Sequence, residues 1–416
     1  MILVALGHCG THWVAATFFT VLPFVATDLG LSYTETGFLV SVFYVSAALA
    51  NVPSGMAADV TGRRVLIQAL ALLGGALALA GFGLVPGGTA APLALAVAVA
   101  VMGATNMLWH PAAISYLSLV YPARKGFALS IHALGANLGD ALGPLAAGAV
   151  LMAVRWPETA YVNALPAILM AGILVVALGR ARGGDAHHVR VGDAREYLRG
   201  MAALLKRRAV WLLCFLAGFR TATQNGLLVF LPLYLTHDLK ASPVAMGFAM
   251  TMLQVGGMIA APLAGLWSDR AGRRPVVLAG LGATTLIVFA LTFVDSLPLY
   301  VAGVSVLGFC MYALRPVIHG WMMDMAPKEL GGSVTSLVFG TQSGLATLIP
   351  VIGGALADRY GLVAVFYFLA GPVLFAHVLT TEQIPQAITR LIVAADMPPW
   401  LFLVVVNVIL LVAGNF

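Results

Sequence analysis

The chain has 416 residues, of which 61% are hydrophobic and only 9% are charged, and its formal net charge is +6. Soluble proteins carry about 25% charged residues, so this composition excludes a water-soluble fold and predicts a surface that mostly faces lipid. The basic residues are confined to particular loops, which favours a role in membrane topology over nucleic-acid binding.

Twelve stretches are long and apolar enough to cross a bilayer, which takes about 20 residues of helix. We therefore predict an all-α membrane protein with twelve transmembrane helices. The predicted spans are 2–27, 34–54, 64–86, 91–119, 126–153, 160–180, 209–235, 243–266, 275–294, 298–323, 331–357 and 362–380.

The polar segments between the spans predict the topology and the domains. With the N-terminus in the cytoplasm, the inner loops hold 16 Lys and Arg residues and the outer loops hold 3, as expected for a multi-pass protein of the inner membrane. Residues 181–208 are predicted to be a basic cytoplasmic linker between six-helix bundles at 1–180 and 209–380. Residues 381–416 form an atypical tail, with room for an extra apolar helix.

Two polar loops, GMAADVTGRRVL at 55–66 and GLWSDRAGRRPVVL at 265–278, repeat one pattern. Other matches, such as Gly37 with Gly247 and Gly148 with Gly354, have similar offsets. The sequence therefore predicts one duplication of a six-span unit, an architecture typical of transporters whose site lies between the halves. The repeated loop residues, 210 positions apart, are Gly55, Asp59, Gly62, Arg63 and Arg64, and Gly265, Asp269, Gly272, Arg273 and Arg274.

These twin loops, in their places after spans two and eight, resemble the signature of the major facilitator superfamily. The resemblance implies two pseudo-symmetric bundles that work by alternating access. It also implies that Asp59 and Asp269, with the neighbouring arginines, lock the cytoplasmic face and release it during transport. Topology anchoring alone is the alternative for these loops.

Span five resembles the antiporter motif of exporters in that family, through Gly139, Gly143, Pro144 and Gly148. Close helix packing is the alternative role for its glycines. The stretch WHPAAISYLSLVYPARKGFALSIHALGANLGDALGP also resembles the fosmidomycin-resistance type of exporter, which implies proton-driven efflux of small anionic or drug-like molecules. The tail, through LFAHVLTTEQIPQ and PPWLFLVVVN, resembles instead the large membrane subunit of tripartite ATP-independent periplasmic transporters.

Ionisable side chains inside a bilayer are costly, so those within the spans are candidates for function. Arg220 and Arg315 outnumber the one mid-span carboxylate, Asp140. An anionic substrate would supply the missing charge, because a guanidinium suits carboxylate or phosphonate oxygens. Alternatively, Asp140 neutralises one arginine, and backbone carbonyls or water satisfy the other.

Asp140 is the predicted proton carrier, with a structural role as hydrogen-bond acceptor as the alternative. His8, His12 and His110 are predicted to share in proton relay, although each could be an ordinary packed histidine. Polar residues that either line the cavity or join helices are Gln224, Asn225 and Gln342.

The sequence lacks a phosphate-binding loop around its lysines, an H-E-x-x-H motif and paired C-x-x-C motifs, so we predict no enzyme, no cofactor and no metal site. The predicted function is proton-coupled efflux of a small organic solute by a monomer in the bacterial inner membrane, with the lipid bilayer and no nucleic acid as partner. An uptake symporter for an organic anion and a non-transporting sensor or scaffold are the alternatives.

Overall fold

The computed structural model describes residues 1–85, 91–179, 208–325 and 331–381. Nearly all of the predicted linker and tail, including the predicted extra helix, lie outside these ranges. The described secondary structure is entirely helical and confirms a helix at each of the twelve predicted spans. The helices are α1 (Ile2–Leu29), α2 (Tyr33–Thr61), α3 (Arg64–Gly83), α4 (Ala91–Val120), η1 (Pro122–Arg124), α5 (Lys125–Val150), α6 (Trp156–Leu178), α8 (Arg208–His237), α9 (Pro243–Ala271), α10 (Arg273–Leu291), α11 (Leu297–Met325), α12 (Gly331–Tyr360) and α13 (Leu362–Thr381).

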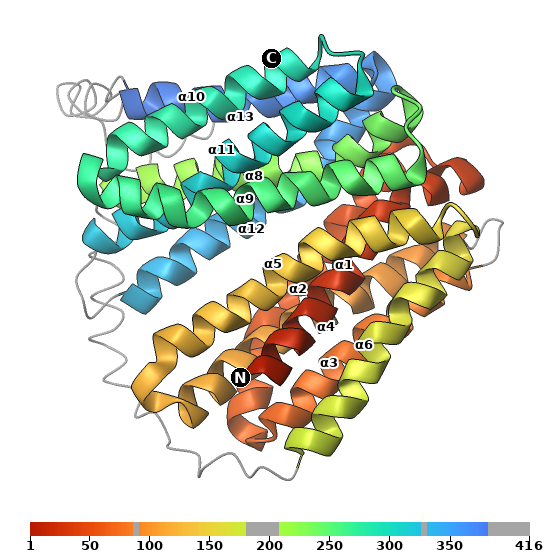
Figure 1. The fold of residues 1–416 in the computed structure, drawn as a ribbon, viewed down its shortest axis with the longest axis vertical. Helices are drawn as coiled ribbons and strands as arrows, with labels where there is room; N and C mark the ends of the chain where they lie inside the picture. The colour runs from red at the N-terminus through yellow and green to blue at the C-terminus, as the bar shows by residue number, and fades with distance from the viewer. Residues whose placement is uncertain (86–90, 180–207, 326–330, 382–416) are drawn as a thin grey trace, which may run out of the picture.

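Within the described ranges, eight helices are long and apolar enough to be membrane spans by composition alone: α1, α2, α3, α4, α6, α9, α10 and α11. The helices outside this set include α5, which carries Asp140, and α8, which carries Arg220. Ionisable residues lower the apolarity of a helix, and such residues normally face the interior of a bundle rather than lipid. Helices α1–α6 and α8–α13 form two bundles that lie side by side (Figure 1).

Corresponding hydrogen bonds join the two bundles at two seams. On the seam between α2 and α12, the Ser41 hydroxyl donates to the carbonyl oxygen of Thr347 at 2.6 Å. On the seam between α9 and α5, the Thr251 hydroxyl donates to the carbonyl oxygen of Ala141, also at 2.6 Å. The donors are 210 positions apart in the sequence and the acceptors 206 apart. The predicted duplication is thus visible in the packing between the bundles.

Close approaches between backbones show the same correspondence between the two seams. A methyl group added at Gly37 on α2 would collide with the carbonyl oxygen of Pro350 on α12, and one added at Gly247 on α9 would collide with that of Pro144 on α5. Only glycine, which has no side chain, permits such a close approach of two backbones. The spacing of the helices at each seam therefore depends on a glycine. A second such pair brings Gly354 against Tyr33 and Gly148 against Pro243.

The contacts between the bundles gather at one end, which we call the distal end and which holds the start of α2 and the ends of α8 and α12. There, the Asp358 carboxylate accepts hydrogen bonds from the backbone N–H groups of Tyr33 at 2.8 Å and Thr34 at 2.9 Å. His237 lies 3.1 Å from the Thr27 hydroxyl and 3.2 Å from the Tyr33 hydroxyl. Side chains from both bundles therefore close this end.

The opposite end, which we call the signature end, holds the twin loops after α2 and α9. Figure 1 shows α5 and α9 close together at the distal end and diverging toward the signature end. Added methyl groups at Gly55 and Gly265 would meet no atom within 4 Å, in contrast to the glycines of the seams. The described residues thus adopt a conformation closed at the distal end and parted at the signature end.

Candidate functional site

Close packing of α1 on α5 creates a cluster of polar side chains inside the first bundle. Glycines of α5 face α1: an added methyl group would collide with a backbone carbonyl at Gly135 and at Gly139. At Gly139 it would also lie 2.9 Å from the Cβ atom of His12. The small residues therefore let α1 approach closely enough for its histidines to reach α5. We call the resulting group the histidine cluster: His8, His12, His110, His132 and Asp140.

Asp140 and His12 form a hydrogen-bonded pair at the edge of this cluster. The Nδ1 atom of His12 lies 2.9 Å from Oδ1 of Asp140. The side chains of His12 and Asp140 are 24% and 30% exposed, respectively, so the pair is reached by solvent rather than sealed in the core. The next residue along α5, Ala141, belongs to the seam with α9. The predicted proton carrier thus lies where the two bundles part.

His8 lies deeper and is buried. Its Nδ1 atom is 2.8 Å from the carbonyl oxygen of His132, and the two rings stack with centroids 3.7 Å apart. The ring of His132 is itself held by the indole N–H of Trp109, which donates to its Nε2 atom at 3.2 Å. Trp109 is fully buried, so a rigid aromatic support fixes the orientation of both histidines.

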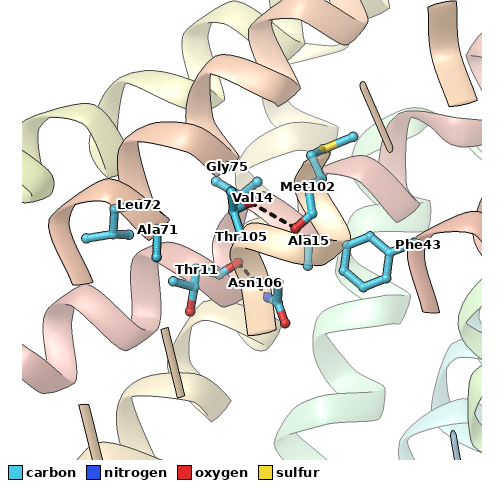
Figure 2. Close-up of a pocket in the computed structure, with 10 residues that line it drawn as sticks. All are labelled: Thr11, Val14, Ala15, Phe43, Ala71, Leu72, Gly75, Met102, Thr105 and Asn106. Carbon is cyan, nitrogen blue, oxygen red and sulfur yellow. Dashed lines mark hydrogen bonds between the residues drawn. The ribbon is translucent and has the colours of Figure 1, made fainter. Parts of the chain in front are cut away.

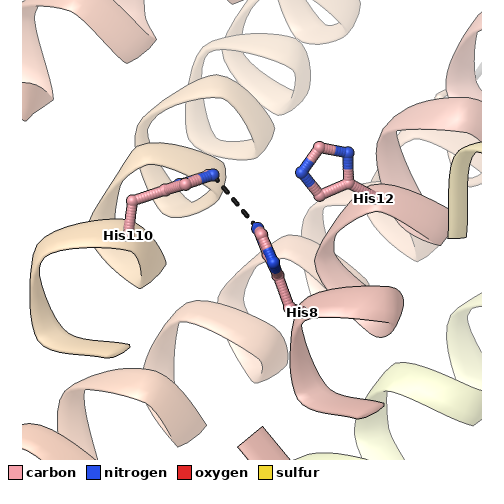
Figure 3. Close-up of side chains that lie close together, drawn as sticks. All are labelled: His8, His12 and His110. Atoms are coloured by element: carbon pink, nitrogen blue, oxygen red, sulfur yellow. Dashed lines mark hydrogen bonds between the residues drawn. The ribbon is translucent and has the colours of Figure 1, made fainter. Parts of the chain in front are cut away.

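His110 reaches the cluster from α4. Its Nδ1 atom lies 2.9 Å from the carbonyl oxygen of Asn106, and its Nε2 atom lies 3.3 Å from the Nε2 atom of His8. Figure 3 shows the rings of His8, His12 and His110 converging from two helices. One ring nitrogen from each lies within 4.8 Å of the others, a grouping that could hold a metal ion.

The arginines lie on the second bundle. Arg220 is 3% exposed, and its guanidinium donates to neutral oxygens, those of Gln224 at 2.7 Å and Thr221 at 2.8 Å. Arg315 is exposed on α11 and lies within electrostatic range of Arg220. In the described part of the chain, no carboxylate lies within ion-pair distance of Arg220. The structure thus brings the two predicted arginines together.

Tyr312 on α11 lies within electrostatic range of Asp140 and of both Arg220 and Arg315. The remaining predicted polar residues, Asn225 on α8 and Gln342 on α12, are both 8% exposed. The candidate site therefore spans the two bundles, with a cationic side on the second bundle and the histidine cluster on the first.

Two hollows in the described part of the chain are lined neither by the histidine cluster nor by the two arginines. A cavity of about 10 Å³ lies among Thr11, Leu72, Met102 and Asn106 (Figure 2); that is space for about one water molecule, too little for an organic solute. A larger hollow of about 560 Å³ has an apolar lining from α3 and α4, which includes Leu77 and Val101. A polar solute would find its partners between the bundles instead.

The twin loops make contacts inside their own bundles. Arg273 donates to Asp324 on α11 at 3.0 Å and to Asp269 at the end of α9. Arg64 donates to the Ser115 hydroxyl on α4 at 2.6 Å. Gly62 and Gly272 follow α2 and α9 with φ values of 62° and 89°, a conformation that favours glycine. Of the other loop residues, Gly55 and Gly265 are half-buried, and Arg63 and Arg274 are exposed. The side chain of Asp59 lies outside the described part of the chain.

Four residues that support the histidine cluster or the seams were assigned no role from the sequence: His132, Trp109, Ser41 and Thr251. His132 carried a signal, because it lies eight positions before Asp140 and so on the same face of α5. The matching offset of Ser41 and Thr251 also carried a signal. Trp109 carried none, because its role depends on how α4 meets α5.

Comparison with known proteins agrees with this architecture. A family model described as Major Facilitator Superfamily matches residues 4–234 and 213–413. The chain is 27% identical over 335 residues to the probable nitrate/nitrite transporter NarK2 of Mycobacterium tuberculosis (strain ATCC 25618 / H37Rv), covering 80% of this chain and 82% of the relative. It is 25% identical over 353 residues to the multidrug efflux pump Tap of the same strain, covering 82% of each.

The resemblance to the large membrane subunit of tripartite ATP-independent periplasmic transporters corresponds to a short match. Over 54 residues, the chain is 52% identical to the C4-dicarboxylate TRAP transporter large permease protein DctM of Pseudomonas aeruginosa (strain PAO1), which covers 13% of each protein. This similarity is partial and does not extend over the rest of either chain.

Among solved structures, a bacterial homologue of the human lysosomal transporter Spinster, in an inward-facing and occupied conformation, superposes with a TM-score of 0.77. It is 15% identical and covers 91% of this chain and 94% of that one. Such a likeness shows the fold, and the family match covers both bundles. Members of this family are transporters and not enzymes, as predicted. The chain is therefore a multi-pass membrane protein that belongs to the Major Facilitator Superfamily.

Proposed function

We propose that this secondary transporter moves a small organic anion out of a bacterial cell, across the plasma membrane, in exchange for protons. The observation that carries the proposal is Arg220, a buried guanidinium whose described hydrogen-bond partners, Gln224 and Thr221, are neutral. Burying a charge without a counter-charge is costly. An anionic substrate between Arg220 and Arg315 would offset that cost, because guanidinium groups bind carboxylate and phosphonate oxygens with good geometry.

The arrangement of the bundles supports alternating access. Ser41 and Thr251 hold the seams toward the distal end, whereas the signature end is parted. The surplus of Lys and Arg in the loops of the signature end favours a cytoplasmic location for that end, and hence for the N-terminus. In this conformation a cytoplasmic solute would approach the arginines, and opening of the seams would release it on the other side. The signature arginines would then lock the cytoplasmic face.

The position of Asp140 supports proton coupling. Its carboxylate is partly exposed, pairs with His12 and immediately precedes the seam residue Ala141. Opening the seam would therefore expose Asp140 to the opposite side of the membrane. The export direction is supported by the exporter-like pattern of span five and by the name of the relative Tap, a multidrug efflux pump. NarK2, whose name gives nitrate and nitrite as its substrates, favours an anionic solute.

Purified protein in proteoliposomes tests the proposal against a panel of small carboxylates and phosphonates under an imposed pH gradient. Replacing Arg220 with Gln should abolish anion transport, because the remaining amide carries no charge. The matched control is Arg155→Gln, since Arg155 pairs with Asp28 at the distal surface, away from the site. Asp140→Asn should keep anion exchange but lose the response to the pH gradient. Equal anion transport by Arg220→Gln and the wild type would contradict the proposed site.

A further inference from the structure

The Nε2 atoms of His8 and His110 face each other at 3.3 Å inside the first bundle. We infer that His8, His12 and His110 form a binding site for a divalent first-row transition-metal ion, with Zn²⁺ as the reference ion. The inference rests on which hydrogens these rings can carry, on the spacing of their nitrogens and on the groups that orient them.

The hydrogens on His8 and His110 follow from their partners. Nδ1 of His8 lies 2.8 Å from the carbonyl oxygen of His132, and Nδ1 of His110 lies 2.9 Å from that of Asn106. A carbonyl oxygen only accepts hydrogen bonds, so both Nδ1 atoms carry the hydrogen. In the neutral rings both Nε2 atoms then present lone pairs, and these point at each other. Two lone pairs at this distance repel unless a cation lies between them.

His12 supplies a third nitrogen. Its Nδ1 atom lies 2.9 Å from the Asp140 carboxylate, which likewise accepts, and this leaves Nε2 of His12 as a lone-pair donor. Figure 3 shows a ring nitrogen of His12 pointing toward His8 and His110. All three histidines thus donate one ring N–H to a carbonyl or a carboxylate and offer the other nitrogen to the centre. Metal-binding histidines in proteins are held in this way.

The spacing fits a small ion. Nitrogens bound at about 2.05 Å to a tetrahedral ion lie about 3.3 Å apart, which matches the 3.3 Å between His8 and His110. The three candidate atoms lie within 4.8 Å of one another, so His12 would need to approach by about 1.5 Å to complete the set. Imidazole nitrogen suits zinc, nickel, cobalt and copper. Three protein ligands leave one position open for water or an anion.

His132 belongs to the support of this site and not to its ligands. Its Nε2 lone pair already accepts from the indole of Trp109, while its ring and its carbonyl oxygen hold His8. The sequence predicted no metal site because His110 is about a hundred positions from His8, a separation that forms no recognisable motif. Only the spacing of His8 and His12, four positions apart and hence on one face of α1, carried part of the signal.

The full-length protein, purified in detergent without a polyhistidine tag and treated with chelator, tests the inference. Titration with Zn²⁺ by calorimetry, and with Co²⁺ by its visible absorption, should show one ion per chain. His8→Gln, His12→Gln and His110→Gln should each weaken binding about 100-fold or more, and Asp140→Asn about 10- to 100-fold. His377→Gln is the matched control, because His377 lies in the second bundle with its ring nitrogen 3.2 Å from the Leu278 carbonyl oxygen, and it should leave binding unchanged.

Absence of stoichiometric binding by the wild-type protein would overturn the inference and leave a shared proton as the cation between His8 and His110. Equal binding by the wild type and monodisperse ligand variants would overturn it as well. If a variant does not fold, an increase in the unfolding temperature of the wild type by Zn²⁺, and a smaller one in the remaining ligand variants, supports the site. Binding is measured without transport, so the result is independent of whether the proposed substrate is correct.

Discussion

The hydroxyl of Thr251 on α9 donates a 2.6 Å hydrogen bond to the carbonyl oxygen of Ala141, the residue that follows Asp140 on α5. This bond crosses between the bundles and ends next to the predicted proton carrier. Replacing Thr251 with Val removes the donor while preserving shape. A hydrogen bond contributes about 1 kcal/mol net. The ratio of the distal-closed to the distal-open population should therefore fall about fivefold. Spin-label distances across the distal end would measure this shift.

A suitable control is Thr285→Val. Thr285 also donates to a carbonyl four positions earlier, that of Leu281 at 3.0 Å, as Thr251 does to Gly247 at 3.0 Å. This control therefore reproduces the loss within the helix but leaves the seam intact. If both variants gave the same distance distribution as the wild type, the seam bond would have no part in holding the distal end closed.

The glycines at the seams allow a second test, in which a steric collision weakens the seam instead of the loss of a hydrogen bond. A methyl group at Gly247 on α9 would collide with the carbonyl oxygen of Pro144 on α5. Gly247→Ala should force the two helices apart at a cost of about 1–3 kcal/mol and reduce transport together with distal closure. Gly172→Ala is the control, because a methyl group there meets no atom within 4 Å. Normal transport by Gly247→Ala would show that the seam tolerates a wider spacing.

The distal end should also depend on pH through Asp358, which lies at the exposed end of α12. Burial raises the pKa of Asp358, but the hydrogen bonds from the Thr34 side chain and backbone and from the Tyr33 backbone together lower it below the ordinary value. Because the pKa is lowered, the contact stabilises the distal-closed conformation fully above the ordinary Asp pKa of about 4. This stabilisation is lost as the pH falls through the lowered pKa.

Label distances across the distal end should therefore stay constant above that range and increase in acid. Asp358→Asn should be more open at neutral pH, because an amide accepts these donors less strongly than a carboxylate, and its opening should respond less to acid. An identical acid response in the wild type and in Asp358→Asn would assign the effect to another group.

Arg273 allows a test of the twin loops. It joins α10 to Asp324 on α11 and to Asp269 on α9. Both carboxylates are more than half exposed, so we expect Arg273→Ala to lower the free energy of unfolding by no more than about 1 kcal/mol. Its counterpart 210 positions earlier, Arg63, is exposed, and Arg63→Ala should have a smaller effect. Thermal unfolding in detergent compares the two, and a larger loss for Arg63→Ala would contradict this assignment.

Local signals were sufficient to predict most of the fold. The length of the apolar stretches predicted each of the twelve helices, because a chain segment that crosses lipid must satisfy its own backbone hydrogen bonds. The repeated loops predicted the duplication. The i,i+4 pairing of Asp269 with Arg273 could likewise be expected from spacing alone. Close packing at the glycines of span five was considered from the sequence, but not that Gly135 and Gly139 face α1 while Gly148 faces α9.

The site was less accessible to sequence reasoning. That His12 pairs with Asp140, or that His8 meets His110, depends on how α1 lies against α4 and α5, which no local pattern encodes. The two arginines were predicted as equivalent, yet Arg220 is buried and Arg315 is exposed. The histidine cluster was predicted only as separate residues because its members come from three helices, α1, α4 and α5.

The paired seams have a consequence for how such a chain could arise. The first bundle alone contains Ser41, the counterpart of Thr251, and Ala141, the counterpart of Thr347. Each half therefore carries both the donor and the acceptor surface of the joint. Two copies of one half would be self-complementary about a twofold axis, the requirement for an isologous homodimer. An ancestral six-helix protein could have used the same joint between separate subunits before the two copies were joined in one chain.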